Sequence, residues 1–139
     1  MQWEIIKSSN EVIEYIDNTL GDFNKTQVNY NSKMDYLPLN FHICNKLGNV
    51  IAGINAFSCW QMLYISEFYV DENFRNKGLG TLLLTKIEQE AKKVGSIISQ
   101  TDTFDWQAKD FYLKFGYDVF GIIENAPEGH KRYYLKKVL

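Results

Sequence analysis

The segment that decides the fold reads FYVDENFRNKGLG over residues 68–80. It follows a stretch, Met62–Val70, that is rich in aromatic and β-branched side chains and therefore predicts a strand. After it, from Gly80 to Val94, apolar side chains recur at helical spacing, which predicts a long helix that ends at Gly95. A strand, a glycine-containing loop and a helix in this order indicate an α/β protein.

The loop before this helix carries Arg75, Lys77, Gly78 and Gly80. The start of a helix presents unpaired N–H groups and a positive dipole end, and glycine lets a phosphate approach the backbone closely. The dinucleotide fingerprint requires a third glycine where Leu83 stands, and the P-loop requires the order Gly-Lys-Ser/Thr, so neither motif fits. The pattern predicts a phosphate site of another kind.

The remaining pattern, Arg-x-x-Gly-x-Gly over residues 75–80, resembles the acetyl-CoA signature of the GNAT superfamily of N-acyltransferases. A second segment, DWQAKDFYLKFGY over residues 105–117, resembles that family's later motif, Asn-x-x-Ala-x-x-Phe-Tyr-x-x-x-Gly-Phe. It follows after one predicted helix and one predicted strand, as the family fold requires. The tail, with Pro127 and Gly129-His130, is similar to that of short bacterial members.

The resemblance implies one acetyltransferase domain over residues 1–139 that binds acetyl-CoA as acetyl donor and needs no metal. Asp105 stands where the family usually has an asparagine, and a carboxylate cannot donate a hydrogen bond as an amide does, so this contact is in question. The positions that match the family's cofactor site are Phe68, Val70, Arg75, Asn76, Lys77, Gly78, Leu79, Gly80, Thr81 and Asp105.

Tyr112 matches the position that often serves as general acid in the family, where a phenol would give a proton to the departing thiolate. It also belongs to an apolar stripe on the helix predicted from about Trp106 to Phe115, so a purely structural role is the alternative. Asp105, just before this helix, is expected to be its N-cap.

Glu67 is the candidate base. Strict alternation along the strand places Glu67 with Leu63, Ile65 and Tyr69 on one largely apolar face. A carboxylate there is costly unless it is paired or faces a polar cleft, and burial would strengthen it as a base. Glu67 is expected to act directly, through water, or as an anchor for the substrate ammonium, and a structural carboxylate is the alternative.

The other periodic segments complete a mixed, mostly antiparallel α/β sheet of six to seven strands flanked by about four helices. Trp3–Ile6 reads as a first strand, and Ser9 or Asn10 caps a helix that Gly21 ends. The strand-helix-strand unit from Met62 to Thr101 predicts one parallel pair.

The net charge of −2, without a large basic cluster, argues against nucleic acid or an anionic membrane as partner. No apolar run approaches the length of a membrane span, so a cytoplasmic location is expected. The prediction is an N-acetyltransferase that acetylates a primary amine of a small molecule by direct attack, and a homodimer is compatible with the resemblance. The alternatives are a protein or peptide N-acetyltransferase and a non-catalytic acyl-CoA sensor.

Overall fold

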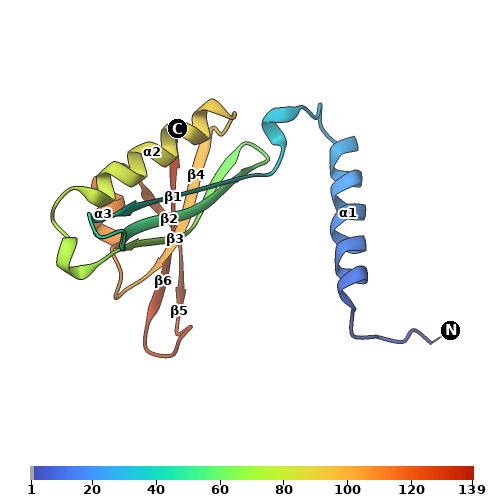
Figure 1. The fold of residues 1–139 in the computed structure, drawn as a ribbon. Coiled ribbons are helices and arrows are strands. Elements are labelled where there is room, and N and C mark those ends of the chain that lie inside the picture. Colours follow the sequence, from blue (N-terminus) through green and yellow to red (C-terminus); the bar gives the residue numbers. More distant parts are fainter. Residues whose placement is uncertain (1) are drawn as a thin grey trace. The chain divides into compact units, whose positions relative to one another are not determined.

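The computed structural model describes residues 2–139, which divide after Ser32 into two compact units. The larger unit, Lys33–Leu139, contains the whole sheet and two of the α-helices (Figure 1). The elements are α1 (Asn10–Thr26), a 3₁₀ turn (Ser32–Met34), β1 (Leu37–Cys44), β2 (Val50–Cys59), β3 (Met62–Val70), a second 3₁₀ turn (Glu72–Phe74), α2 (Leu79–Lys93), β4 (Ile98–Phe104), α3 (Lys109–Lys114), β5 (Asp118–Glu124) and β6 (Lys131–Val138).

The N-terminal unit contains α1, and its helix start agrees with the sequence because the side chain of Ser9 accepts a hydrogen bond from the Val12 N–H. The helix continues through Gly21 to Thr26, since one glycine costs a helix only about 1 kcal/mol. The predicted strand at Trp3–Ile6 is wrong, because the described residues before α1 form no strand.

The sheet has the strand order β1-β2-β3-β4-β6-β5, in which only β3 and β4 run parallel. The chain crosses from β3 to β4 through α2, as the strand-helix-strand pattern predicts. The expected mixed sheet is therefore confirmed, with six strands. Within residues 2–139 there are three α-helices instead of the four expected.

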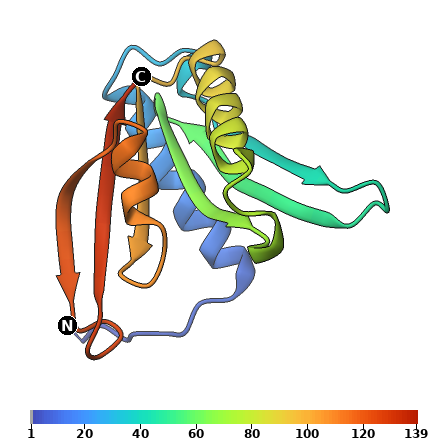
Figure 2. The same cartoon turned by 90° about the vertical axis from the view of Figure 1, so that its left-hand side faces the viewer.

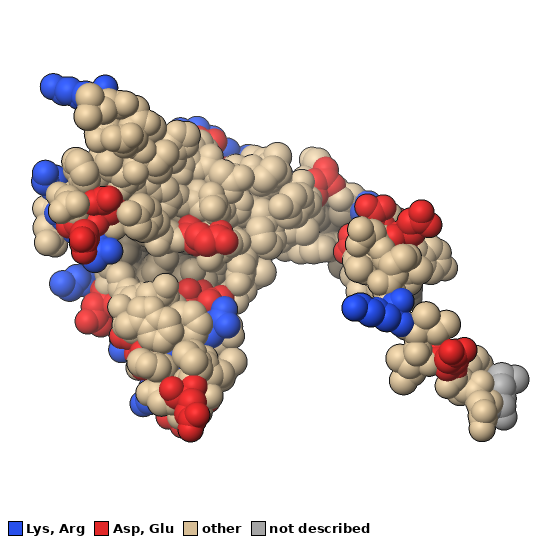
Figure 3. Space-filling view, turned by 60° about the horizontal axis from the view of Figure 1, so that its bottom comes forward, with Lys and Arg blue, Asp and Glu red and all other residues tan. Residues whose placement is uncertain are grey.

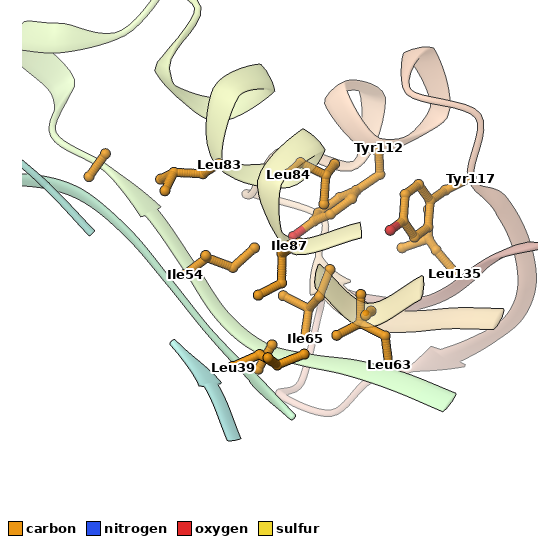
Figure 4. Close-up of a cluster of buried hydrophobic side chains, with 13 residues drawn as sticks. Leu39, Ile54, Leu63, Ile65, Leu83, Leu84, Ile87, Tyr112, Tyr117 and Leu135 are labelled. Carbon is orange, nitrogen blue, oxygen red and sulfur yellow. The ribbon is translucent and has the colours of Figure 1, made fainter. Parts of the chain in front are cut away.

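The core lies between one face of this sheet and α2 (Figure 4). The buried side of α2 is apolar at helical spacing and packs on residues that alternate along the central strands. The ring of Tyr112 from α3 extends this core beside α2. The main contributors are Leu39, Ile54, Leu63, Ile65, Leu83, Leu84, Ile87, Ala91 and Leu135.

A β-bulge interrupts the pairing of β2 with β3. Asn55 pairs with Glu67, whereas the next residue, Ala56, pairs with Ile65, so Ser66 is an extra residue in β3. An extra residue reverses the alternation of side chains beyond it.

The expected alternation along β3 is therefore correct only as far as Ile65. Leu63 and Ile65 belong to the core, and beyond the bulge Phe68 and Val70 pack against the same core. Glu67 consequently does not share a face with Leu63 and Ile65, as strict alternation predicted. It projects from the other side of the sheet.

Candidate functional site

The parallel strands β3 and β4 separate partway along their length (Figure 2). Their pairing extends from Met62 opposite Ile98 to Ile65 opposite Thr101, and the bulge at Ser66 follows at once. Beyond this point a cleft of about 1170 Å³ opens. Its walls come from the second half of β3, the loop before α2, the second half of β4, α3 and Arg132 of β6.

The N-terminus of α2 lies in this cleft. Gly78 is the N-cap residue, in the left-handed conformation with φ +82°, and no side chain caps the helix. The carbonyl of Gly78 accepts the first hydrogen bond of the helix, from Leu82. The N–H groups of Leu79, Gly80 and Thr81 therefore have no acceptor within the helix, and all three residues line the cleft. Such a group of N–H donors binds phosphate well.

Gly80 has a second reason to be glycine. A Cβ atom at this position would lie 3.3 Å from the ring of Phe111 and 3.5 Å from the ring of Phe68. These two rings are in contact with each other, with centroids 5.7 Å apart. The small residue therefore lets α2 approach the aromatic wall of the cleft closely.

The basic residues of the loop differ in position. Arg75 lines the cleft, but its Nε also donates a hydrogen bond to the carbonyl of Val70 at 3.0 Å, which fixes the loop. Lys77 does not line the cleft, and its ammonium lies 5.3 Å from the ring centre of Phe74. Of the other predicted cofactor positions, Phe68, Val70 and Asn76 line the cleft.

Asp105 does not have the helix-capping role that the sequence predicts. It does not cap a helix, because α3 begins only at Lys109 with Ala108 as the N-cap residue. Its carboxylate accepts hydrogen bonds from the Lys131 N–H and from Nδ1 of His130, both at 2.9 Å. These hydrogen bonds, that from the Lys131 main chain first, lower the pKa of Asp105. Asp105 thus joins the β4–α3 loop to β6 and is not among the residues that line the cleft.

The helix predicted from Trp106 is shorter at its start because Gln107 holds the preceding loop. The side-chain oxygen of Gln107 accepts hydrogen bonds from the Phe104 N–H at 2.8 Å and from the Thr103 hydroxyl at 3.1 Å. These bonds turn the chain directly after β4. The later positions of the predicted helix form α3.

Tyr112 lies on α3 with its ring in the core, 5% exposed, and it also lines the cleft. Its ring packs edge-on against Phe68, and its phenol is hydrogen-bonded to the side chain of Thr101. Burial raises the pKa of Tyr112 to about 12, and the nearby charge of Asp102 acts in the same direction while the bond to Thr101 opposes it. The phenol is therefore neutral at physiological pH, and the side chain both packs in the core and lines the cleft.

Glu67 also lines the cleft, but it is exposed, so the expected burial is wrong. The reason is the bulge, which turns Glu67 to the side of the sheet opposite Phe68 and beyond the last residue paired with β4.

The sequence analysis did not predict a polar network that also lines the cleft. The carboxylate of Asp102 on β4 accepts hydrogen bonds from Nε and Nη2 of Arg132 at 3.0 and 2.7 Å, both on Oδ1, and from the Tyr64 hydroxyl at 2.9 Å on Oδ2. Asp102 and Arg132 line the cleft. Aspartate is rare within strands, and this was the one signal in the sequence that pointed to Asp102.

The cleft connects the two faces of the sheet. Thr101 belongs to the helix-covered face, where Tyr112 and Gly80 also lie. Asp102, one residue on, belongs to the opposite face together with Arg132. The N–H groups at the start of α2 and the charged side chains of Glu67, Asp102 and Arg132 thus lie on opposite sides of one cleft.

The surface view in Figure 3 shows basic and acidic side chains interspersed over the displayed face. None of the helices among residues 2–139 has the length and apolar character needed to cross a membrane. In the same part of the chain, no three or more His, Cys, Asp or Glu side chains are grouped as metal ligands.

The fold and this site define a mixed α/β protein with a helix N-terminus suited to bind phosphate, next to a gap between parallel strands. The model of the acetyltransferase (GNAT) family matches residues 10–117, so the chain belongs to this family and is an acetyl-transferring enzyme. Acetyltransferases of this family use acetyl-CoA, which agrees with the donor predicted from the glycine loop.

Individual relatives support the assignment. The chain is 33% identical over 99 residues to blasticidin-S acetyltransferase of Streptomyces morookaense, covering 70% of this chain and 73% of the relative. The crystal structure of an acetyltransferase from Bacillus cereus has a TM-score of 0.89 at 30% identity, covering 99% of this chain and 98% of that one. A Bacillus anthracis protein crystallised with acetyl coenzyme A shares the fold, with a TM-score of 0.66 at 20% identity over 73% of this chain and 62% of that one.

Proposed function

We propose that this enzyme transfers the acetyl group of acetyl-CoA to a primary amine of a small molecule by direct attack. The observation that carries the proposal is the cleft between β3 and β4, which joins the N-terminus of α2 and Tyr112 on one face to Glu67 on the other. A relative whose name gives blasticidin-S as its acceptor supports a small-molecule acceptor.

The donor is held by main-chain groups. The N–H groups of Leu79, Gly80 and Thr81 receive the pyrophosphate, and Arg75 adds a positive charge at the rim. Within the described residues, the edge of β3 beyond Ile65 has no partner in β4, so the main chain from Ser66 to Val70 is available to the extended arm of the donor. In this proposal the thioester lies near Tyr112.

The chemistry requires two proton movements. The acceptor ammonium loses one proton before attack, and its nitrogen then forms a bond to the thioester carbonyl carbon. As the carbon–sulfur bond breaks, a second proton passes from this nitrogen to the departing sulfur, directly or through water. Glu67, on the acceptor side, binds the ammonium and takes its proton directly or through water. Tyr112, on the donor side, donates a hydrogen bond to the leaving sulfur.

The pKa of Tyr112 limits what this phenol does. A phenol with a pKa of about 12 is a much weaker acid than an ordinary thiol, whose pKa is about 8.5. Complete transfer of its proton to the thiolate is therefore unfavourable. Tyr112 acts chiefly by stabilising charge on sulfur through a hydrogen bond as the carbon–sulfur bond lengthens.

The test is release of free thiol from acetyl-CoA by the purified chain with polyamines, amino acids, amine-containing antibiotics and short peptides. Mass spectrometry should show one added acetyl group on the small molecule that releases thiol, and Gly80→Asp protein should give no product. Acetylation confined to peptides would overturn the small-molecule acceptor, and thiol release without an acetylated amine would overturn amine transfer.

A further inference from the structure

The acceptor side of the cleft contains one arginine whose orientation is fixed. The guanidinium of Arg132 lies 5.1 Å from the ring centre of Phe104 and 5.6 Å from that of Tyr134. Phe104 is opposite Arg132 in the β4–β6 register, so the flanking ring comes from the strand that forms the cleft wall. Aromatic rings near a guanidinium favour its cationic form and restrict its rotation.

Asp102 fixes the same guanidinium along one edge. Nε and Nη2 of Arg132 both donate to the single oxygen Oδ1, while Oδ2 accepts from the Tyr64 hydroxyl. In a bidentate pair, the arginine would have donated to both carboxylate oxygens of Asp102. In the described residues, Nη1 of Arg132 donates no hydrogen bond, although the side chain is 37% exposed and lines the cleft.

Three charged side chains thus line the acceptor side of the cleft: Arg132, Asp102, which is paired with it, and Glu67. Glu67 suits an ammonium group, and the outer edge of the Arg132 guanidinium suits an anion. A planar guanidinium held in one orientation matches the geometry of a carboxylate, which accepts two parallel hydrogen bonds from it. Asp102 and Tyr64 position the arginine and need not contact the acceptor.

Resting on the proposed function, we propose that Arg132 binds a carboxylate of the acceptor, so that the substrates are amines that also carry a carboxylate group, such as amino acids. The amine then meets the thioester from the side of Glu67. Arg132 is a specificity-determining residue, and the carboxylate it binds lies away from the reacting nitrogen.

The experiment compares amines that differ only in a carboxylate: lysine with cadaverine, and ornithine with putrescine. For wild-type protein, kcat/KM should be about 10- to 100-fold higher for the amino acid, as expected for hydrogen bonds between charged groups. Arg132→Gln should abolish this preference while leaving the affinity for coenzyme A unchanged. Arg132→Lys keeps the positive charge but not the planar guanidinium, so it should retain part of the preference for the amino acid.

Lys136→Gln is the matched control, because it removes a positive charge from the same strand and face but outside the cleft. Its preference for the amino acid should equal that of wild type within about twofold. Equal kcat/KM for both members of each pair in wild type, or an equal loss for both in Arg132→Gln, would show that Arg132 is only structural.

Calorimetry separates this proposal from the proposed function. If no amine releases thiol, amine transfer fails, and the dissociation constants of lysine and cadaverine for protein saturated with coenzyme A still report on Arg132. Tighter binding of lysine that is lost in Arg132→Gln would support the carboxylate site. Equal binding of both, or binding of neither, would overturn it.

Discussion

The hydroxyl of Thr101 donates a hydrogen bond to the main-chain carbonyl of Ile65 at 3.1 Å, at the last position where β3 and β4 pair. This bond marks the point from which the cleft opens. The hydrogen bond between the side chains of Thr101 and Tyr112 lowers the pKa of the phenol and so opposes the effect of burial. Thr101 thus links the end of the β3–β4 pairing to the phenol of Tyr112.

Replacement of Tyr112 by phenylalanine keeps the ring packing and removes only the hydroxyl. If the phenol stabilises the leaving sulfur, kcat should fall about 10²- to 10³-fold while the affinity for coenzyme A stays within about twofold. Steady-state kinetics and calorimetry measure the two quantities. Tyr117→Phe is the control, since this buried phenol bonds to Glu88 and Ser99 and does not line the cleft, and its kcat should be normal.

Glu67→Gln should lower kcat/KM for the acceptor by about 10²- to 10⁴-fold, because the amide neither takes a proton nor attracts an ammonium. Coenzyme A binding should not change, since Glu67 is on the acceptor side of the sheet. Glu72→Gln in the following 3₁₀ turn removes an equal charge outside the cleft and should leave kcat/KM unchanged. Normal turnover by Glu67→Gln at all pH values would remove Glu67 from the mechanism.

Substitutions in the glycine loop should weaken the affinity for coenzyme A in a defined order. Arg75→Ala should weaken binding about tenfold, because it removes a charge and the bond that fixes the loop but leaves the N–H groups. Gly80→Asp should abolish measurable binding, since the carboxylate repels phosphate and its Cβ presses on Phe111.

Gly80→Ala separates these two effects, because it adds the Cβ without the charge. Its affinity should lie between those of wild type and Gly80→Asp. Calorimetry on the folded proteins gives the series, and wild-type binding by Gly80→Asp would place the donor elsewhere.

Asp105→Asn tests whether the family's usual asparagine was replaced at the cost of donor binding. The asparagine oxygen still accepts from the Lys131 N–H, and Asp105 is outside the cleft. Affinity for coenzyme A should therefore stay within about twofold of wild type. Asp105→Ala should lower the melting temperature instead, because it unties the β4–α3 loop from β6. A large gain in affinity for Asp105→Asn would mean that this side chain does contact the donor.

The raised pKa of Tyr112 predicts loss of stability at alkaline pH. Below pH 10 the phenol is protonated in the folded and the unfolded chain, so its contribution is fully present. Between pH 10 and about 12 the unfolded chain loses this proton first, and the free energy of unfolding falls by about 2–3 kcal/mol. Urea unfolding at pH 9 and pH 11 should show a smaller drop for Tyr112→Phe than for wild type. An identical drop would contradict the assigned burial.

The sequence by itself determined the parts of this protein that depend on neighbouring residues. The strand Met62–Val70, the glycine loop and the start of the following helix agree with prediction within one residue. Each depends on local conformational preference and on periodicity, which a short window contains. The glycine loop carries the first of the two motifs that indicate the family, and the family match confirms the assignment.

The tertiary structure alone decided how the site is assembled. The bulge at Ser66 arises from the pairing of β3 with β2, and it reverses the side on which Glu67 projects. The Tyr64, Asp102 and Arg132 network joins three strands that are distant in sequence. Strand register sets which side chains meet, and register depends on the partner strand, so no local pattern contains it. For the same reason Trp3–Ile6 does not form a strand, although its composition is typical of one.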